Sequence, residues 1–343
     1  MNRAWLVVAL SIASCRCTPS GGQRNDPGGT PSVKSTGSAL PSTSTTTSTP
    51  TSTPTSTSTG TSTGTGPSED DLDVKDCPKV LVEARKGGTV RGSYVDPSDA
   101  ELSAISHAMS ALVGGKEDEA QREAGRAGFQ IVDVPEMAGV VAMVEKDKRR
   151  GGGAYLVRKG SSSKLVVQAP HTFFDEGTFP LACSFFRDTN ARALFINTVH
   201  RYKGAAENAG HDSDVAHLKS SLFLSATTGL LEAVPAPAVV QLHGFDKGRD
   251  MKAVVSAGED RPGAAHVAKV AKELDAILGG GVARYPEDTR ELGATTNVEG
   301  KAIRAKGGRF LHIEMSGTTR KLLLADAQKR SAAFAAIATI ATP

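Results

Sequence analysis

Hydrophobic positions in the second half of the chain fall into short β-branched runs, separated by longer amphipathic segments. Runs of this length are typical of buried strands in a parallel sheet, and the longer segments of helices that cover it. The pattern predicts strands at 164–169, 192–197, 238–243, 252–257 and 309–314, and helices at 177–187, 214–232, 263–278 and 322–341. We therefore predict an α/β fold with a mostly parallel sheet and helices on both faces.

A different pattern precedes this part. Residues 96–127 carry apolar side chains at helical spacing, interrupted once by a pair of glycines. Three short apolar runs follow, at 129–133, 139–144 and 154–157, and are typical of strands joined by turns. We interpret 70–150 as a small α+β part and 151–343 as the main α/β domain.

Polar positions dominate the chain before residue 70. Residues 15–69 are almost free of large apolar side chains, and much of the segment consists of Ser, Thr, Pro and Gly. Such a composition cannot bury enough apolar surface to offset the entropy of an ordered backbone. We predict a disordered tether with a root-mean-square reach of about 40 Å.

The first residues have the pattern of a secretory signal, in which Arg3 precedes a short apolar stretch and small residues follow. The last four residues of this stretch, Ile12 to Cys15, resemble the bacterial lipobox. The resemblance implies a lipoprotein signal peptide at 1–14, lipidation of Cys15 and attachment to a membrane. Because Arg16 follows the cysteine, we expect the outer membrane of a Gram-negative bacterium.

Charge and cysteine content narrow the function classes. The net charge is +3, and Lys and Arg are mixed with acids throughout, so no basic stripe predicts a nucleic-acid partner. Besides Cys15 and Cys17 near the N-terminus, the only cysteines are Cys77 and Cys183, and either a disulfide or two buried thiols would fit. Since no CxxC pair is present, any metal must be held by His and carboxylate side chains.

Polar side chains at the ends of three predicted strands are the candidates for chemistry. His171 and His243 each follow an apolar run, and Glu314 ends a third. Because the carboxyl ends of parallel strands meet at one edge of a sheet, these side chains should converge. Asp175 and Glu176 follow His171 in the same loop, so either can add a carboxylate. Two imidazoles and a carboxylate form a common catalytic zinc shell.

Zinc in such a shell would polarise an amide carbonyl and activate water, and Glu314 would move the proton. Arg201 or Arg320 could hold a substrate carboxylate, and His217 could face the site. We interpret residues 213–214 as the cap of the following helix rather than as part of a metal cluster with His211. No Gly-x-Ser-x-Gly elbow is present, and Cys183 has no neighbouring base, which argues against nucleophilic serine or cysteine catalysis. His107, His266 and His312 are interpreted as surface or core residues.

Five segments in order resemble the successive blocks of the zinc-dependent N-acetylmuramoyl-L-alanine amidases. They also resemble the wider phosphorylase/hydrolase-like group, which includes N-formylglutamate amidohydrolases and zinc carboxypeptidases. The segments are 166–182, 193–201, 213–217, 239–245 and 310–323.

The resemblance implies that Zn²⁺ is held by His171, Glu176 and His243, with Glu314 as the catalytic residue. The glutamate follows the first histidine more closely than in the amidases, which keeps Asp175 as an alternative ligand. The implied substrate is peptidoglycan or a small N-acyl amino acid or peptide. Two alternatives remain: a zinc carboxypeptidase or N-formylglutamate-type enzyme for a small acidic substrate, and a catalytically inactive module that binds the cell wall.

Overall fold

The computed structural model describes residues 74–90, 92–147, 150–202, 213–246 and 250–342, all of which belong to one compact unit. The predicted signal peptide, the predicted tether and Cys15 lie outside the described residues, as does His211. Among the helices of the described part, none is both long and apolar enough to cross a membrane.

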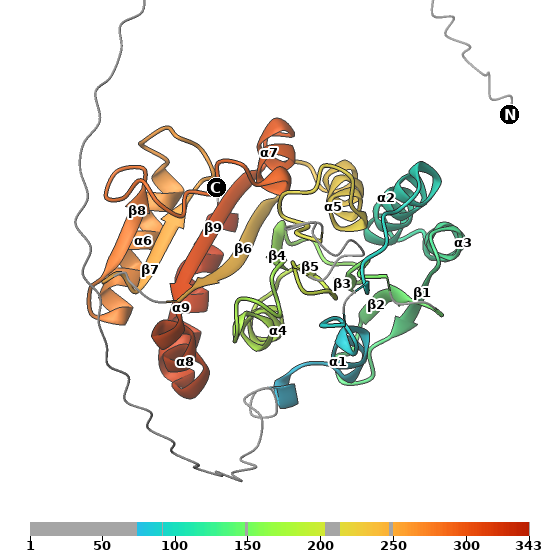
Figure 1. Cartoon of the computed structure of the whole chain (residues 1–343), viewed down its shortest axis with the longest axis horizontal. Coiled ribbons are helices and arrows are strands. Elements are labelled where there is room, and N and C mark those ends of the chain that lie inside the picture. Colours follow the sequence, from blue (N-terminus) through green and yellow to red (C-terminus); the bar gives the residue numbers. More distant parts are fainter. Residues whose placement is uncertain (1–73, 91, 148–149, 203–212, 247–249, 343) are drawn as a thin grey trace, which may run out of the picture. The chain divides into compact units, whose positions relative to one another are not determined.

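One sheet of nine strands forms the centre of this unit (Figure 1). Its order is β1-β2-β3-β5-β4-β6-β9-β7-β8. The strands are β1 (Phe129–Asp133), β2 (Val140–Glu145), β3 (Ala154–Arg158), β4 (Leu165–Ala169), β5 (Ala193–Ile196), β6 (Ala238–Phe245), β7 (Ala253–Ser256), β8 (Val282–Tyr285) and β9 (Arg309–Ser316). The strands from the predicted α+β part therefore extend the same sheet as those of the predicted main domain.

The sheet is mixed, so the prediction of a mostly parallel sheet is wrong. The four central strands β5, β4, β6 and β9 are parallel, as are β7 and β8. β1, β2, β3 and β5 pair antiparallel in succession, and β7 runs antiparallel to β9. β2, β3 and β7 are nearly or fully buried along their length, so they have the same continuous apolar pattern as parallel strands. Such a pattern reports burial on two faces and carries no information about strand direction.

Helices cover both faces of the sheet, as predicted. One face packs against α2, α3, α5 and α7, and the other against α1, α4, α6, α8 and α9. In Figure 1, α2, α5 and α7 lie above the sheet, and α4 and α8 lie below it. The helices are α1 (Lys79–Arg85), α2 (Asp99–Val113), α3 (Glu117–Arg126), α4 (Thr178–Asp188), α5 (Leu222–Ala233), α6 (Ala265–Leu278), α7 (Val298–Ala305), α8 (Gly317–Ala325) and α9 (Ala327–Ala338).

Capping side chains explain where the helices differ from the predicted ranges. The helix predicted at 214–232 begins only at Leu222, because the Ser221 hydroxyl accepts the N–H of Leu224. The range 322–341 holds parts of two helices, since Asp326 ends α8 and caps α9. The sequence pattern missed β8 and α7, which are only four and eight residues long.

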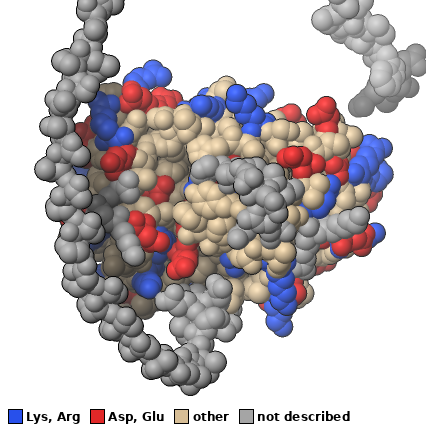
Figure 2. Space-filling model, in the orientation of Figure 1, with Lys and Arg blue, Asp and Glu red and all other residues tan. Residues whose placement is uncertain are grey.

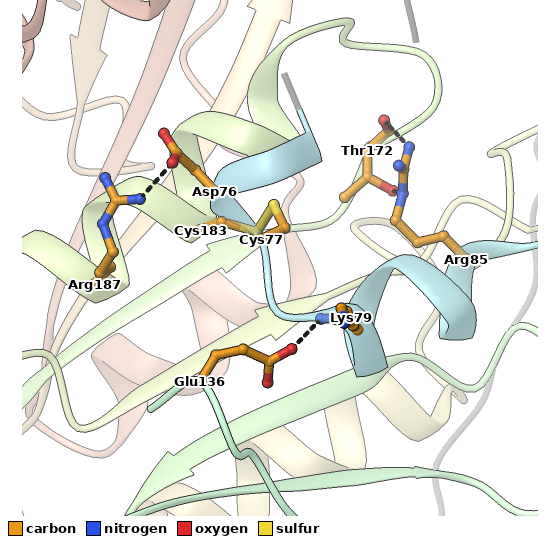
Figure 3. Close-up of a disulfide and its surroundings, with 8 residues drawn as sticks. All are labelled: Asp76, Cys77, Lys79, Arg85, Glu136, Thr172, Cys183 and Arg187. Atoms are coloured by element: carbon orange, nitrogen blue, oxygen red, sulfur yellow. Dashed lines mark hydrogen bonds and ion pairs between the residues drawn. A yellow bond between two sulfur atoms is a disulfide. The ribbon is translucent and has the colours of Figure 1, made fainter. Parts of the chain in front are cut away.

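A disulfide links the N-terminal end of the described chain to a helix that packs on the sheet. Cys77 is bonded to Cys183 in α4, which decides between the two alternatives for these cysteines (Figure 3). Close by, Arg85 of α1 donates to the Thr172 carbonyl oxygen and lies over the rings of Phe173 and Phe179. The segment 77–85 is thereby fastened to the loop that follows β4.

Charged side chains of both signs are interspersed on the described part of the face in Figure 2. They lie mainly toward its edges, around a central area of uncharged residues.

Candidate metal centre

The carboxyl ends of β4, β6 and β9 lie side by side at one edge of the sheet. Their polar side chains lie on the face that packs against α5 and α7. In the parallel register His243 of β6 lies beside Glu314 of β9, and Gln241 lies beside His312. Gln168 of β4 pairs with Gln241, so the loop after β4 places His171 next to His243. The convergence of His171, His243 and Glu314 follows from strand ends at one edge, as a parallel arrangement requires.

Three ligand atoms form a nearly equilateral triangle at this edge. The Nδ1 atoms of His171 and His243 lie 3.0 Å apart. Asp175 Oδ2 lies 3.4 Å from His171 Nδ1 and 3.3 Å from His243 Nδ1. In a tetrahedral zinc shell with bonds of about 2.0–2.1 Å, two ligand atoms lie roughly 3.3 Å apart. The three side chains therefore fit one face of such a shell.

Burial makes this triangle costly without a bound cation. The side chains of His171, Asp175 and His243 are 4%, 2% and 4% exposed. Asp175 Oδ2 is buried and accepts no hydrogen bond within the described residues. A buried carboxylate oxygen needs a donor or a metal, because water cannot compensate its charge there. The orphaned oxygen lies within 3.4 Å of both Nδ1 atoms, so a single cation could contact all three.

Outer side chains orient both imidazoles. His171 Nε2 lies 2.8 Å from Asp214 Oδ1, and His243 Nε2 lies 2.9 Å from Gln241 Oε1. When each Nε2–H donates to its oxygen, each Nδ1 keeps a lone pair for a metal. Arg201 in turn donates to Asp214 Oδ2.

A buried chain of amides and a hydroxyl holds Gln241 in place. Asn297 Nδ2 donates to Gln241 Oε1 over 2.6 Å, and Gln241 Nε2 donates to Gln168 Oε1 over 3.1 Å. Gln168 Nε2 donates to the Thr227 hydroxyl. Each of these four side chains is buried, so the chain fixes which Gln241 atom faces His243.

The electrostatics of the two histidines differ. Burial lowers the pKa of His171, but the neighbouring carboxylates of Asp175 and Asp214 outweigh this and raise the pKa to about 9. Burial lowers the pKa of His243 to about 4, despite the neighbouring Asp175 carboxylate. Burial opposes the effect at Asp175, but the two neighbouring histidines hold its pKa below the usual range. Because a metal ion binds only unprotonated imidazole nitrogens, metal binding here would compete with protonation of His171.

Glu314 lies beside this triangle with a carboxyl group that is 12% exposed. Burial, reinforced by the charge of Asp175, raises the pKa of Glu314 to about 8. Its Oε2 atom has no hydrogen-bond partner within the described residues. Raised pKa, burial and an unused oxygen are the properties of a carboxyl group that can exchange a proton with a substrate.

His312 was interpreted as a surface or core residue, and the structure places it in the site. Its ring centroid lies 4.4 Å from that of His243, and Nε2 lies 3.7 Å from Glu314 Oε1. His243, His312 and Glu314 form a second group whose atoms could hold a metal ion. Both groups need His243. We assign the metal to the first group, because the Nδ1 atom of His243 already belongs to the triangle with the orphaned carboxylate.

Glu176 does not join the triangle. Its side chain is exposed, and its carbonyl oxygen accepts a hydrogen bond from Arg320. The structure therefore brings together His171, His243 and the alternative carboxylate Asp175.

Arg320 is buried and holds strand ends rather than facing a substrate. Its guanidinium donates to the carbonyl oxygens of Phe245 and Met315, at the ends of β6 and β9, and to Asp246. A Cβ on Gly244 would lie 2.0 Å from Arg320 Nη1, so glycine is required for this close approach.

Arg201, a predicted substrate contact, lies with Nη1 3.3 Å from His171 Nδ1. His217 is more distant: its side chain is 45% exposed, and Nε2 lies 4.0 Å from Asp214 Oδ2. Asp214 is fully buried and, contrary to the predicted capping role, contacts His171.

Sequence reasoning missed Gln168, Gln241, Asn297 and the role of Asp214. A signal for the glutamines exists: each interrupts an apolar run, three and two positions before His171 and His243 respectively. A polar side chain in a buried strand needs a partner, and here the partner is part of the site. Asp214 and Asn297 lie in loops and have no such signal.

Comparison with known proteins finds similar folds at low identity. No family model and no curated protein sequence matches the chain. A bacteriophage poly-gamma-glutamate hydrolase structure matches 57% of this chain and 90% of its own, with 13% identity and a TM-score of 0.37. The N-formylglutamate amidohydrolase of Ralstonia eutropha matches 55% of this chain and 97% of its own, with 13% identity and a TM-score of 0.35. At such TM-scores the likeness is no basis for assigning an activity.

Proposed function

We propose that the chain is a zinc-dependent hydrolase that cleaves an amide bond. One observation carries the proposal: two imidazole nitrogens and an orphaned carboxylate oxygen, all buried, form a triangle whose edge lengths match the ligand–ligand distances of a tetrahedral metal shell. Neutral imidazole and carboxylate ligands suit zinc, and three protein ligands leave a fourth position for water or substrate. His171, Asp175 and His243 would hold the ion.

Zinc held by these three side chains would supply Lewis-acid chemistry, polarising the amide carbonyl and lowering the pKa of a bound water toward ~7. The chain's own groups must then move one proton. Glu314, as carboxylate, accepts the proton of the attacking water and delivers it to the leaving nitrogen. The products are a carboxylic acid and an amine, and Glu314 returns to its initial state.

Arg201 supplies a positive charge next to the site. Its Nη1 atom lies 3.3 Å from a metal-facing nitrogen, and its Nη2 atom is held by Asp214. An oriented guanidinium at this place stabilises the negative charge that develops on the carbonyl oxygen. Asp214 therefore orients two groups, the His171 ring and the Arg201 guanidinium.

Metal content is the direct test. We expect about one zinc per chain by mass spectrometry in the wild type, and loss of it in His171→Ala, His243→Ala and Asp175→Ala. The matched control is Glu176→Ala, the neighbouring exposed carboxylate, which should keep zinc. Absence of zinc from the wild type after reconstitution, or loss of zinc in Glu176→Ala alone, would contradict the assignment.

The substrate and the location of this activity are further proposals, supported by sequence alone. The resemblance to amidases supports peptidoglycan or a small N-acyl amino acid or peptide as substrate. The lipobox-like residues support a lipid anchor on Cys15 at the outer membrane. Metabolic labelling with a radioactive fatty acid should mark the wild type and leave Cys15→Ser unlabelled.

A further inference from the structure

His312 lies beside the metal ligands but offers no atom to the triangle that they form. Its side chain is 5% exposed, and its ring centroid lies 4.4 Å from that of His243. Its Nε2 atom lies 3.7 Å from Glu314 Oε1. Its Nδ1 atom is buried and has no hydrogen-bond partner within the described residues. The ring therefore turns one nitrogen toward the proposed general base and leaves the other unpaired.

Strand β9 sets this arrangement through a spacing of two residues. Side chains two positions apart in a strand lie on the same face of the sheet, so His312 and Glu314 project from one face. The neighbouring strand β6 has the same spacing, with Gln241 beside His312 and His243 beside Glu314. His312 therefore lies one step behind the edge at which the metal ligands converge.

The unpaired Nδ1 atom decides where the ring carries its hydrogen. A neutral imidazole has one N–H group and one lone pair, and a doubly protonated ring has two N–H groups. With its only hydrogen on Nδ1, the ring would bury an N–H group without an acceptor and turn a bare Nε2 toward a carboxyl group. With the hydrogen on Nε2, the N–H group faces Glu314 Oε1. The Nε2–H form is therefore favoured in the neutral ring, and the doubly protonated ring has this group as well.

Glu314 needs a donor of this kind to act as a base in a fixed orientation. The last torsion of a glutamate side chain is broad, so an unsupported carboxylate can exchange its two oxygens by rotation. Glu314 Oε2 is buried and has no hydrogen-bond partner within the described part of the chain. A donor at Oε1 fixes the plane of the carboxylate and leaves the lone pairs of Oε2 for a water molecule.

We propose that His312 is a positioning residue for Glu314: its Nε2–H group donates to Oε1 and thereby reserves Oε2 for the proton of the attacking water. The inference rests on the proposed function for the role of Glu314 as general base. His312 keeps its own hydrogen, so the proton that leaves the water passes only through Glu314 to the leaving nitrogen. The 3.7 Å separation is longer than a hydrogen bond, and the hydrogen bonds of catalytic groups often tighten only when substrate binds.

The position of the hydrogen in the His312 ring is the direct test. Full-length protein with ¹⁵N-labelled histidine rings is treated with a chelator and measured by NMR at a pH well above 8, because burial raises the pKa of Glu314 to about 8. Long-range ¹H–¹⁵N correlations distinguish the two tautomers, and the signals that are absent from His312→Gln belong to His312. We expect Nε2–H in the wild type and in Glu314→Gln, which keeps an acceptor oxygen. In Glu314→Leu we expect a mixture of both tautomers.

Two results of this measurement would overturn the proposal. One is an Nδ1–H ring in the wild type. The other is a Glu314→Leu variant with unchanged His312 signals, because the carboxylate would then not be the partner of Nε2. Since the chelator removes metal throughout, a chain that binds no zinc would contradict the proposed function and still give a definite tautomer.

Turnover of dye-labelled peptidoglycan tests the role in catalysis. His312→Leu removes the donor and should lower kcat about 10–100-fold with little change in KM or zinc content, as is typical for loss of an outer partner. His312→Gln, whose amide N–H can replace Nε2–H, should recover much of the rate. The matched control is His266→Leu, which removes an imidazole that lies 3.2 Å from the Phe310 carbonyl oxygen of the same strand and should leave kcat unchanged.

Equal kcat in His312→Leu and the wild type would refute the positioning role. Equal losses in His312→Leu and His312→Gln would reduce His312 to a packing residue. A wild type that is inactive on this probe would contradict the proposed substrate, and the ring tautomer would then decide the role of His312.

Discussion

The Nδ1 atoms of His171 and His243 lie 3.0 Å apart, and each ring's Nε2 atom contacts a side-chain oxygen. Two lone pairs at this distance repel each other unless a proton or a metal ion lies between them. The outer oxygens of Asp214 and Gln241 therefore decide the chemistry of the pair, because they hold the hydrogen of each ring away from the other.

Gln241 is the first residue to test for this role. Gln241→Leu removes the acceptor for His243 Nε2–H, so the ring can take the other tautomer or rotate. We expect the zinc affinity to fall about 10–100-fold, as is typical for loss of an outer partner. Competition with a fluorescent chelator measures this affinity.

The matched control is Thr227→Val, which alters the far end of the same buried chain. It should weaken zinc binding less than Gln241→Leu. Equal affinity in wild type and Gln241→Leu, with both proteins folded by circular dichroism, would show that Gln241 does not orient the ligand.

Glu314 should be needed for turnover and not for metal. We expect Glu314→Gln to retain zinc and to lower kcat about 10²–10⁴-fold, since an amide cannot accept the proton of water. The conservative Glu314→Asp should recover part of the rate. Loss of zinc in Glu314→Gln would instead favour the group formed with His243 and His312 as the metal site.

The same residue sets the expected pH dependence. A general base must be ionised, so kcat/KM should rise with pH through the pKa of Glu314. Burial raises this pKa to about 8 in the metal-free chain, and a bound dication lowers it. The ascending limb of a pH profile of kcat/KM should therefore lie at or below pH 8. A limb well above pH 8 would assign it to another group.

Glu299, fully buried at the start of α7, predicts a pH dependence of stability. Burial raises the pKa of Glu299 from 4.5 to about 8. In the unfolded chain this carboxyl group ionises at lower pH than in the folded one, so its contribution to the free energy of unfolding is fully present below pH 4.5. That contribution falls as the pH rises toward 8, by roughly 1.4 kcal/mol per pKa unit at most. Urea unfolding at pH 5 and pH 8 should therefore show a smaller loss of stability in Glu299→Gln than in the wild type, and the loss that remains includes that from Glu314, whose pKa burial also raises.

Reduction of the disulfide should destabilise the folded part. Cys77 and Cys183 are 106 residues apart, and in the loop-entropy model a crosslink over such a span contributes about 4–5 kcal/mol. We expect Cys77→Ser with Cys183→Ser to lower the free energy of unfolding by a large part of this amount in denaturant titrations. A reductant should have the same effect on the wild type and no effect on the double variant.

The sequence determined the positions of the central strands because their residues are buried on both faces. Val166 and Val167 pack on opposite sides of the sheet, so the whole run must be apolar. An apolar run does not indicate strand direction, which is why the antiparallel direction of β7 relative to β9 was not predicted. It depends on how the connections cross the sheet, and that is decided by tertiary packing.

In the candidate site, too, some residues could be predicted from the sequence and others depend on tertiary structure. His171, His243 and Glu314 were predicted because strand ends converge, and the choice between Asp175 and Glu176 was left open. Backbone geometry decides it: the turn after His171 buries the first carboxylate and exposes the second. His312 was missed because its place in an apolar strand fits a core residue equally well, and only the pairing of β6 with β9 puts it beside His243.

The Cys77–Cys183 bond also determines how the folded part responds to mechanical force. Tension that arrives from the N-terminal side reaches Cys77 before it reaches α1, and the covalent bond transmits it to α4. Helix α1 therefore carries none of this tension. The same holds for the hydrogen bond from Arg85 to Thr172, which lies beside the ligand His171. A pull on this end of the oxidised protein loads a covalent crosslink, whereas in the reduced protein the same pull peels α1 from the loop that carries two metal ligands.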